Sequence, residues 1–315
     1  MDREQIMGST PLKKRFVKDC GLPIAIFDEP YFSERVQAID IIYNSIEMFD
    51  RFCYQLSAYD SEQEYFEAYR FIKDSAIDCI KDSGSFNDFI NENFRIESKY
   101  QKKNLYIDEN NDTAFVSIDM KKANFSALSY YSCRIFNDHD TWEGFMRQFT
   151  DNQHIIDSKY IRQVILGACN PKKQIQYEKY LMTILCNWIV ENIPTVNIYS
   201  LGDDEIIIEV AREYGTGCGF SLSQLKDVVN SCPKAVGNLV RVTSFQLHKI
   251  KGTNGWMKFY NDRFDNKTEF KCLEPEVVHQ VIKYFYFEPI TEHDLVFVHN
   301  DKLAKFLKPI ENPFE

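Results

Sequence analysis

The chain has 315 residues, of which 44% are hydrophobic and 15% are aromatic, and it carries a net charge of -10 with a pI near 5.2. These apolar side chains are enough for a buried core, and the length allows one large domain or two modest ones. The acidic balance excludes a protein that coats nucleic acid through its overall charge, although a local basic groove is compatible with it.

The cysteines and the N-terminus predict a cytoplasmic protein, in the host cell if the protein is viral. There are nine cysteines and no C-x-x-C pair, so they read as small core residues in a reducing compartment rather than as disulfides or zinc ligands. Residues 1–5 do not resemble a signal peptide, and no apolar run approaches the roughly 18 residues that cross a membrane. We therefore expect no membrane partner.

Residues 1–95 are predicted to form a mainly helical N-terminal extension. Apolar residues recur at helical spacing after Ser33 and again after Ser61. No linker rich in Pro, Gly or Ser follows, so we expect this extension to pack on the rest of the chain.

A strand is predicted over residues 113–119. Its even-numbered positions, from Ala114 to Ile118, are apolar, and its odd-numbered positions end in Asp119. One face can therefore pack on helices while Asp119 lies on the other. A helix is expected to follow, and Asn124 near its start is a candidate N-cap.

The next segments are predicted as helices over 141–150 and 158–169, followed by a strong amphipathic helix that opens at Lys172. Gly167 to Pro171 is a plausible stop between the last two. From Ser158 to Tyr177 there are four basic residues and no acid. In an acidic chain this pattern indicates a face turned toward phosphate.

Residues 197–210 read as a β-hairpin. Two runs rich in β-formers flank Gly202, Asp203 and Asp204. A solvated turn is the ordinary explanation of such residues. The two adjacent carboxylates repel each other, however, and with Asp119 at a second strand end a divalent cation is the expected counter-charge.

A strand that ends in Asp, a helix, and a later Gly-Asp-Asp hairpin together resemble the palm of right-hand polymerases, specifically viral RNA-dependent RNA polymerases and reverse transcriptases. Asp119 resembles the motif A aspartate, and Leu201 to Asp204 resembles motif C. The resemblance covers about residues 95 to 260. It implies an α+β fold with a polymerase-like palm, in which an antiparallel sheet with an acidic hairpin packs on helices.

The same resemblance implies a metal-dependent nucleotidyltransferase, most simply a template-dependent polymerase. Asp119, Asp203 and Asp204 are then the catalytic residues, and they bind two Mg²⁺ or Mn²⁺ ions. The substrates are nucleoside triphosphates and an RNA or DNA primer-template. The type of template and the choice of sugar stay open, since Asn124 is neither the acid nor the aromatic residue usual in those families.

Further roles follow from the resemblance. Basic residues before motif A hold the incoming triphosphate in those families, although lysines on a surface strand are the more common explanation of such a pattern. A lysine after motif C is a candidate general acid for pyrophosphate. The nucleotide-binding residues implied in this way are Lys102, Lys103, Lys122, Asn124, Lys249 and Lys251.

Nucleic-acid binding is assigned to two segments. The glycine-containing loop before the amphipathic helix stands where those polymerases keep motif B. Residues 228–261 contain no acid and interleave cations with aromatic rings, on predicted strands over 239–250 and 256–260. The candidates are Gly167, Asn170, Lys172, Lys173, Gln174, Trp256 and Lys258.

The predicted domains are the extension at 1–95, a palm-like core at 96–261 and a C-terminal α/β extension at 262–315 packed on the core. The last is expected to hold a helix over 274–288, a strand over 295–299 and a short helix near 303–307. Two alternatives remain. One is another palm-fold enzyme, such as a nucleotide cyclase, a CRISPR-polymerase-like protein or a tRNA-guanylyltransferase-like protein. The other is an inactive palm kept as a nucleic-acid-binding or assembly subunit with partner subunits.

Overall fold

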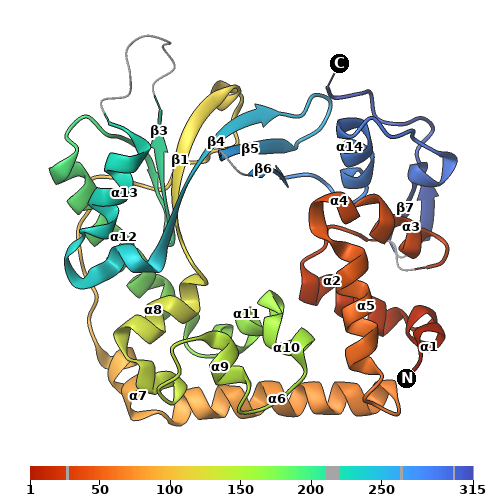
Figure 1. Cartoon of the computed structure of the whole chain (residues 1–315), viewed down its shortest axis with the longest axis horizontal. Helices are drawn as coiled ribbons and strands as arrows, with labels where there is room; N and C mark the ends of the chain where they lie inside the picture. Colours follow the sequence, from red (N-terminus) through yellow and green to blue (C-terminus); the bar gives the residue numbers. More distant parts are fainter. Residues whose placement is uncertain (26–27, 211–219, 263–264, 301, 315) are drawn as a thin grey trace.

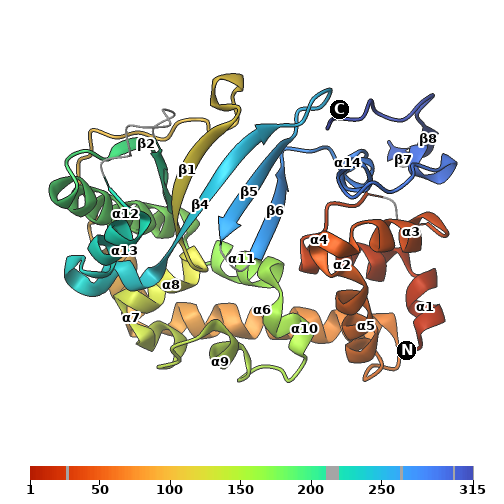
Figure 2. The ribbon, with the colours of Figure 1, turned by 45° about the horizontal axis from the view of Figure 1, so that its top comes forward.

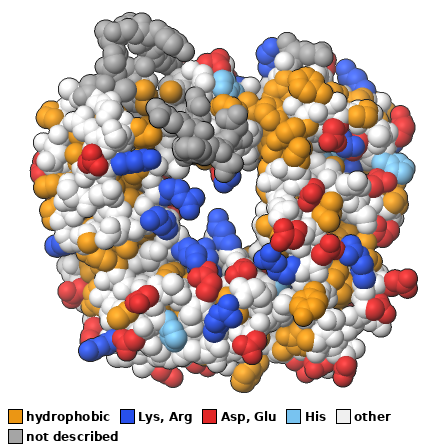
Figure 3. All heavy atoms as spheres, in the orientation of Figure 1, with side chains coloured by type: hydrophobic (Ala, Val, Ile, Leu, Met, Phe, Trp, Pro, Cys, Tyr) orange, Lys and Arg blue, Asp and Glu red, His pale blue; other side chains and the backbone are white. Residues whose placement is uncertain are grey.

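The computed structural model describes residues 1–25, 28–210, 220–262, 265–300 and 302–314. An antiparallel sheet and the surrounding helices enclose a central opening (Figures 1 and 3). The sheet borders the opening on one side, and helix α6 (Glu62–Asp82) runs along the opposite side. The α+β class expected from the sequence is confirmed.

The described part of residues 1–95 is mainly helical, as predicted. Ser61 caps α6 by accepting a hydrogen bond from the Glu64 amide, and buried side chains from Tyr65 to Ile80 recur at three- or four-residue spacing. The other elements here are α1 (Arg3–Gly8), α2 (Thr10–Cys20), α3 (Tyr31–Ala38), α4 (Asp40–Tyr43), α5 (Ser45–Leu56) and α7 (Gly84–Asn91).

The main sheet has six strands in the order β2-β3-β1-β4-β5-β6, and each neighbouring pair is antiparallel. The connections between β1 and β2 and between β3 and β4 contain helices, so the first four strands follow the β-α-β-β-α-β order of ferredoxin-like folds. The strands are β1 (Thr113–Met120), β2 (Asn197–Leu201), β3 (Glu205–Glu209), β4 (Val240–Lys249), β5 (Trp256–Asp262) and β6 (Asp265–Lys271).

The two faces of β1 differ as the alternation predicts. Val116, Ile118 and Met120 join the main core beneath helices α8 (Ala123–Tyr131) and α12 (Pro171–Asn192). On the opposite face Phe115 belongs to a second, smaller core, and Asp119 is exposed. The sheet therefore has one helix-covered face and one face that is partly open (Figure 2).

The remaining helices around β1 and β2 are mostly where the sequence placed them. The helix expected over 141–150 is shorter, and a separate turn of helix follows it. These elements are η1 (Asp108–Asn110), η2 (Cys133–Phe136), α9 (Trp142–Met146), α10 (Gln153–Asp157), α11 (Lys159–Gly167), α13 (Leu222–Asn230) and η3 (Pro233–Leu239).

The C-terminal region departs from the prediction in two ways. The short helix expected near 303–307 is wrong, because β8 (Lys302–Lys305) pairs with β7 (Val296–His299) as an antiparallel strand. The expected boundary at 261 also divides a hairpin, since β6 continues the main sheet. Helix α14 (Val278–Phe285) and η4 (Glu292–Leu295) complete this region, and α14 packs against α3.

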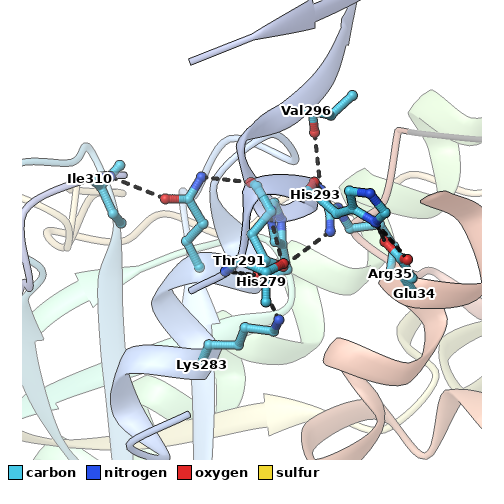
Figure 4. Close-up of polar contacts among 10 residues, drawn as sticks. Glu34, Arg35, His279, Lys283, Thr291, His293, Val296 and Ile310 are labelled. Atoms are coloured by element: carbon cyan, nitrogen blue, oxygen red, sulfur yellow. Dashed lines mark hydrogen bonds and ion pairs between the residues drawn. The ribbon is translucent and has the colours of Figure 1, made fainter. Parts of the chain in front are cut away.

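A buried polar cluster joins the two ends of the chain (Figure 4). The Arg35 guanidinium on α3 lies 3.3 Å from the Asp294 carboxylate and donates to the carbonyls of His293 and Val296. The Lys283 ammonium on α14 lies 2.7 Å from the other oxygen of Asp294. This cluster closes the ring around the central opening.

Within the described residues, none of the helices combines the length and the apolar composition that crossing a lipid bilayer requires.

Candidate functional site

The site is centred on the C-terminal end of strand β1. Asp119 stands between Glu205 on β3 and Arg241 on β4 in the register of the sheet. The Ser117 hydroxyl donates a hydrogen bond of 2.5 Å to Glu205. The Asp119 carboxylate reaches solvent, yet the loss of part of its hydration, with the nearby charges of Glu205 and Asp204, raises its pKa to about 6.

Backbone hydrogen bonds tie the acidic turn to this end of β1. The Met120 amide donates to the Asp204 carbonyl at 2.9 Å, and the Gly202 amide donates to the Glu205 carbonyl at 2.8 Å. A Cβ atom on Gly202 would lie 3.1 Å from that Glu205 carbonyl oxygen. The close approach explains why glycine suits the first position of the turn.

The two aspartates of the turn lie in different surroundings. Asp203 is half-buried, and its carboxylate lies 3.8 Å from the Lys102 ammonium. Asp204 is exposed and lines the same cavity as Asp119. The second aspartate of the turn is therefore the one that shares a cavity with β1.

That cavity, which we name the strand-end cavity, has a volume of about 720 Å³. It lies between the ends of β1 and β4, the acidic turn, and helices α8, α11 and α12. Six of the sequence-predicted residues meet here, namely Asp119, Lys122, Asn124, Gly167, Gln174 and Asp204. Asn124 does not cap α8, because the N-cap position belongs to Lys122.

Glu178 is an acid of this cavity that the sequence analysis did not select. It lies on α12, is 6% exposed, and makes no hydrogen bond or ion pair with any residue that the structure describes. Burial, with the charges of Asp204 and Asp203, raises its pKa to about 7. The sequence offers one sign of this position: Glu178 directly follows Tyr177, which belongs to the apolar stripe of the predicted amphipathic helix.

Cations from α11 and β4 also line the strand-end cavity. Arg162 is 8% exposed, its Nε has no hydrogen-bond partner within the described ranges, and burial lowers its pKa. Lys159 and Arg241 are exposed at the same cavity. These three residues come from the basic stretches noted in the sequence, although none was selected individually.

A second cavity, the sheet-face cavity, covers the open face of the sheet and has a volume of about 650 Å³. Asp119 and Glu205 line one part of it. Lys and Arg side chains gather around the central opening in Figure 3. The basic residues that line this cavity are Lys159, Lys226, Arg241, Lys258, Lys267 and Lys271.

The lysines before β1 lie beside the acidic turn. Lys102 and Lys103 line a cavity of about 430 Å³ together with Gly202 and Asp204. The Lys103 amide donates to the Ser200 hydroxyl at 2.9 Å, which holds this segment against β2. Both lysines therefore lie near the hairpin acids, while phosphate binding stays a prediction.

Lys249 and Lys251 are wrong as nucleotide-binding residues of this site. Strand β4 runs antiparallel to β1, with Arg241 beside Asp119, so Lys249 lies eight positions further along β4. At about 3.3 Å per residue this is roughly 25 Å along the strand from Arg241. The lysine of this region that lies near them is Lys258, which interacts with the charges of Glu205 and Asp119 and has its pKa lowered by burial.

Several predicted nucleic-acid contacts have structural roles. Trp256 is 1% exposed in the second core, so its ring cannot stack on a base. Gln174 is buried and donates to the carbonyls of Leu166 and Cys169. Asn170 caps α12, and Lys173 donates to the Glu92 carbonyl. Lys172 is exposed at the start of α12.

The donor chemistry of the strand-end cavity fits a hard divalent cation. Asp119, Glu178 and Asp204 offer carboxylate oxygens, which Mg²⁺ and Mn²⁺ prefer. Over the described part of the chain, no three His, Cys, Asp or Glu side chains are already close enough to hold an ion together. Asp119 and Asp204 are exposed, so their side chains have room to turn toward one.

Comparisons with protein-family models, curated proteins and solved structures find no match to this chain.

Proposed function

We propose that the chain is a divalent-metal-dependent nucleotidyltransferase with a polymerase-like palm, which extends an RNA or DNA strand on a template. One observation carries the proposal. The β-α-β-β-α-β order brings the Asp119 end of β1 and the Asp203–Asp204 turn to a cavity that cations of α11 and β4 also line. Carboxylates beside cations suit the transfer of a phosphoryl group between oxygens.

Each part of the site has a role in this proposal. Asp119 and Asp204, with Asp203 on the same turn, would hold metal ions. These ions would activate the 3′-hydroxyl of the growing strand and neutralise charge at the α-phosphate. Arg162, with the exposed cations beside it, binds phosphate oxygens of the nucleotide. The cations of the sheet-face cavity lie along the path of the nucleic-acid strand.

The second candidate is an inactive palm that binds nucleic acid. It is favoured by the finding that, among the described residues, no three potential ligands are already gathered around one point. The basic lining of the sheet-face cavity serves either function, so activity must be measured directly.

The test is a primer-extension assay with labelled nucleotides and Mg²⁺ or Mn²⁺, on RNA and DNA, with and without template. We expect a template-dependent ladder that stops when the complementary nucleotide is omitted and that disappears in Asp119→Asn. Small cyclic products, or addition without a template, would favour a cyclase-like or guanylyltransferase-like enzyme. Nucleic-acid binding without any product would favour the inactive palm.

A further inference from the structure

The most unusual side chain of the strand-end cavity is Glu178. It is a carboxylate that is 6% exposed and that makes no hydrogen bond or ion pair within the described segments. Buried carboxylates are normally paired, hydrogen-bonded or bound to a metal, because an isolated one loses its hydration without compensation. Glu178 lines the strand-end cavity, so an ion bound in that cavity would supply the partner that its carboxylate lacks among the described residues.

The orientation of Glu178 is set by the packing of its helix. One turn earlier on α12, Gln174 donates to the carbonyls of Leu166 and Cys169 at the end of α11. This contact fixes the rotation of α12 at that turn, and Glu178 lies on the same side because it is four residues further on. The same cavity is lined by Asp119 and Asp204.

We infer that Glu178 is a further ligand of a divalent cation in the strand-end cavity and anchors the ion to helix α12. The inference rests on the proposed function for the identity of the ion as Mg²⁺ or Mn²⁺. Glu178 is the buried ligand, while Asp119 and Asp204 are exposed and turn toward the ion when it binds. Three elements, β1, the acidic turn and α12, are then joined through one cation.

The geometry has a measurable consequence beyond catalysis. A cation held by Glu178 and Asp204 links α12 to the β2–β3 hairpin, so its binding stabilises the folded chain. Glu178 without the cation is a buried acid with two acidic neighbours, so its replacement by the uncharged, nearly isosteric glutamine is tolerated.

The experiment measures Mn²⁺ binding to the full chain by calorimetry and by electron paramagnetic resonance, without nucleotide. Glu178→Gln is compared with wild type, with Asp204→Asn and with Glu191→Gln, an exposed acid near the end of the same helix. We expect Glu178→Gln and Asp204→Asn each to weaken binding by about tenfold or more. Mn²⁺ should raise the melting temperature of wild type and Glu191→Gln but not of Glu178→Gln.

Wild-type affinity for Mn²⁺ in Glu178→Gln would overturn the inference, and so would a wild-type protein that does not bind Mn²⁺. The outcomes separate this inference from the proposed function. Polymerase activity with Mn²⁺ binding that is indifferent to Glu178 leaves the function standing and removes the ligand. If Mn²⁺ binding depends on Glu178 but the protein adds no nucleotide, the cation site stands and the proposed polymerase function is wrong.

Discussion

Three acids at the site are held in three different ways, and these surroundings decide how each responds to substitution. Asp203 is half-buried beside Lys102, Asp119 is exposed among other acids, and Glu178 is buried without a partner among the described residues. Asp119 and Glu178 both have a raised pKa, since burial and like charges disfavour the ionised form.

Asp119→Asn should abolish nucleotide transfer and leave the fold intact, because the side chain is exposed. The folded pKa of about 6 lies above the ordinary value of 3.8, so the carboxylate destabilises the fold increasingly as pH rises through that range. In EDTA the variant should therefore match wild type at pH 4 and melt higher at pH 8. Because the group is exposed, we expect the variant's free energy of unfolding at pH 8 to exceed that of wild type by less than about 1 kcal/mol.

Thermal melts at the two pH values, alongside primer extension, check this prediction. Near-full turnover in the variant would show that Asp119 binds no catalytic metal. A lower melting temperature at pH 8 would show that its carboxylate is stabilised by its neighbours rather than strained.

At the scale of elements, the N- and C-terminal regions are joined by one charged cluster between α3, α14 and η4. Arg35 and Asp294 are both buried, and Arg35 also donates to two backbone carbonyls of the C-terminal region. A buried pair of this kind adds little over an apolar contact, but removing Arg35 takes one of two cationic partners from the buried Asp294, which keeps Lys283.

Arg35→Ala should lower the free energy of unfolding by roughly 3 kcal/mol, because Asp294 and two carbonyls lose a donor in the interior. The matched control is Arg51→Ala, which removes an exposed pair with Glu47 and should cost less than about 1 kcal/mol. Urea denaturation of the two variants gives the comparison. Equal losses in both would mean that the cluster does not join the two regions energetically.

His279 makes the stability of this region depend on pH. Its Nε2 donates to the Asp294 carbonyl, its Nδ1 is buried without a partner in the described chain, and burial together with Arg35 lowers its pKa. Lys283 adds a second nearby positive charge, and Asp294 opposes both. The ring is therefore neutral in the folded protein.

Because the unfolded chain binds a proton at His279 near pH 6.5 and the folded chain does not, stability should fall as pH drops below that value. The contribution of this group is at most about 1.4 kcal/mol per pH unit. His279→Gln retains an amide donor and should lose less stability than wild type between pH 6.5 and 5. The measurement is the urea midpoint of wild type and of His279→Gln across this pH range. If the midpoints of both proteins fall in parallel, the prediction is contradicted.

The whole molecule has a net charge of -10, yet the surface around the sheet-face cavity is rich in Lys and Arg. The cations of the sheet-face cavity come from α11, α13 and strands β4 to β6, and Lys and Arg side chains surround the central opening in Figure 3. The fold thus concentrates positive charge where a nucleic-acid strand would contact the sheet.

Reversing Lys159 and Lys226 to glutamate should weaken binding of single-stranded nucleic acid. Both residues are exposed in the sheet-face cavity and form no ion pair within the residues described. Each lost phosphate contact should reduce the slope of log affinity against log salt by roughly 0.7 for a single strand. Fluorescence anisotropy over a salt series measures this slope.

The control reverses Lys249 and Lys251, which lie toward the far end of β4 from the acids. Their reversal should leave the slope nearly unchanged. If the control pair shifts the slope as much as Lys159 and Lys226 do, the strand does not follow the sheet-face cavity.

The sequence by itself determined the local features of this protein. Alternation along 113–119 predicts a strand with Asp119 off the core face, and β-formers around Gly202 predict the hairpin, because both depend on residues close in sequence. The same holds for the N-terminal helices and for α12. The helix predicted near 303–307 is wrong, because Leu303 and its neighbours form a strand that pairs with β7. A four-residue pattern does not determine whether a segment pairs with a distant strand.

The tertiary structure alone decided which residues meet. Antiparallel pairing of β4 with β1 removes Lys249 from the acids and brings Arg241 to them. Trp256, a candidate stacking ring, is buried in the core. The packing of α12 places Glu178 in the lining of the strand-end cavity. Such long-range contacts depend on register and packing between segments far apart in the chain, and no local pattern of residue types encodes them.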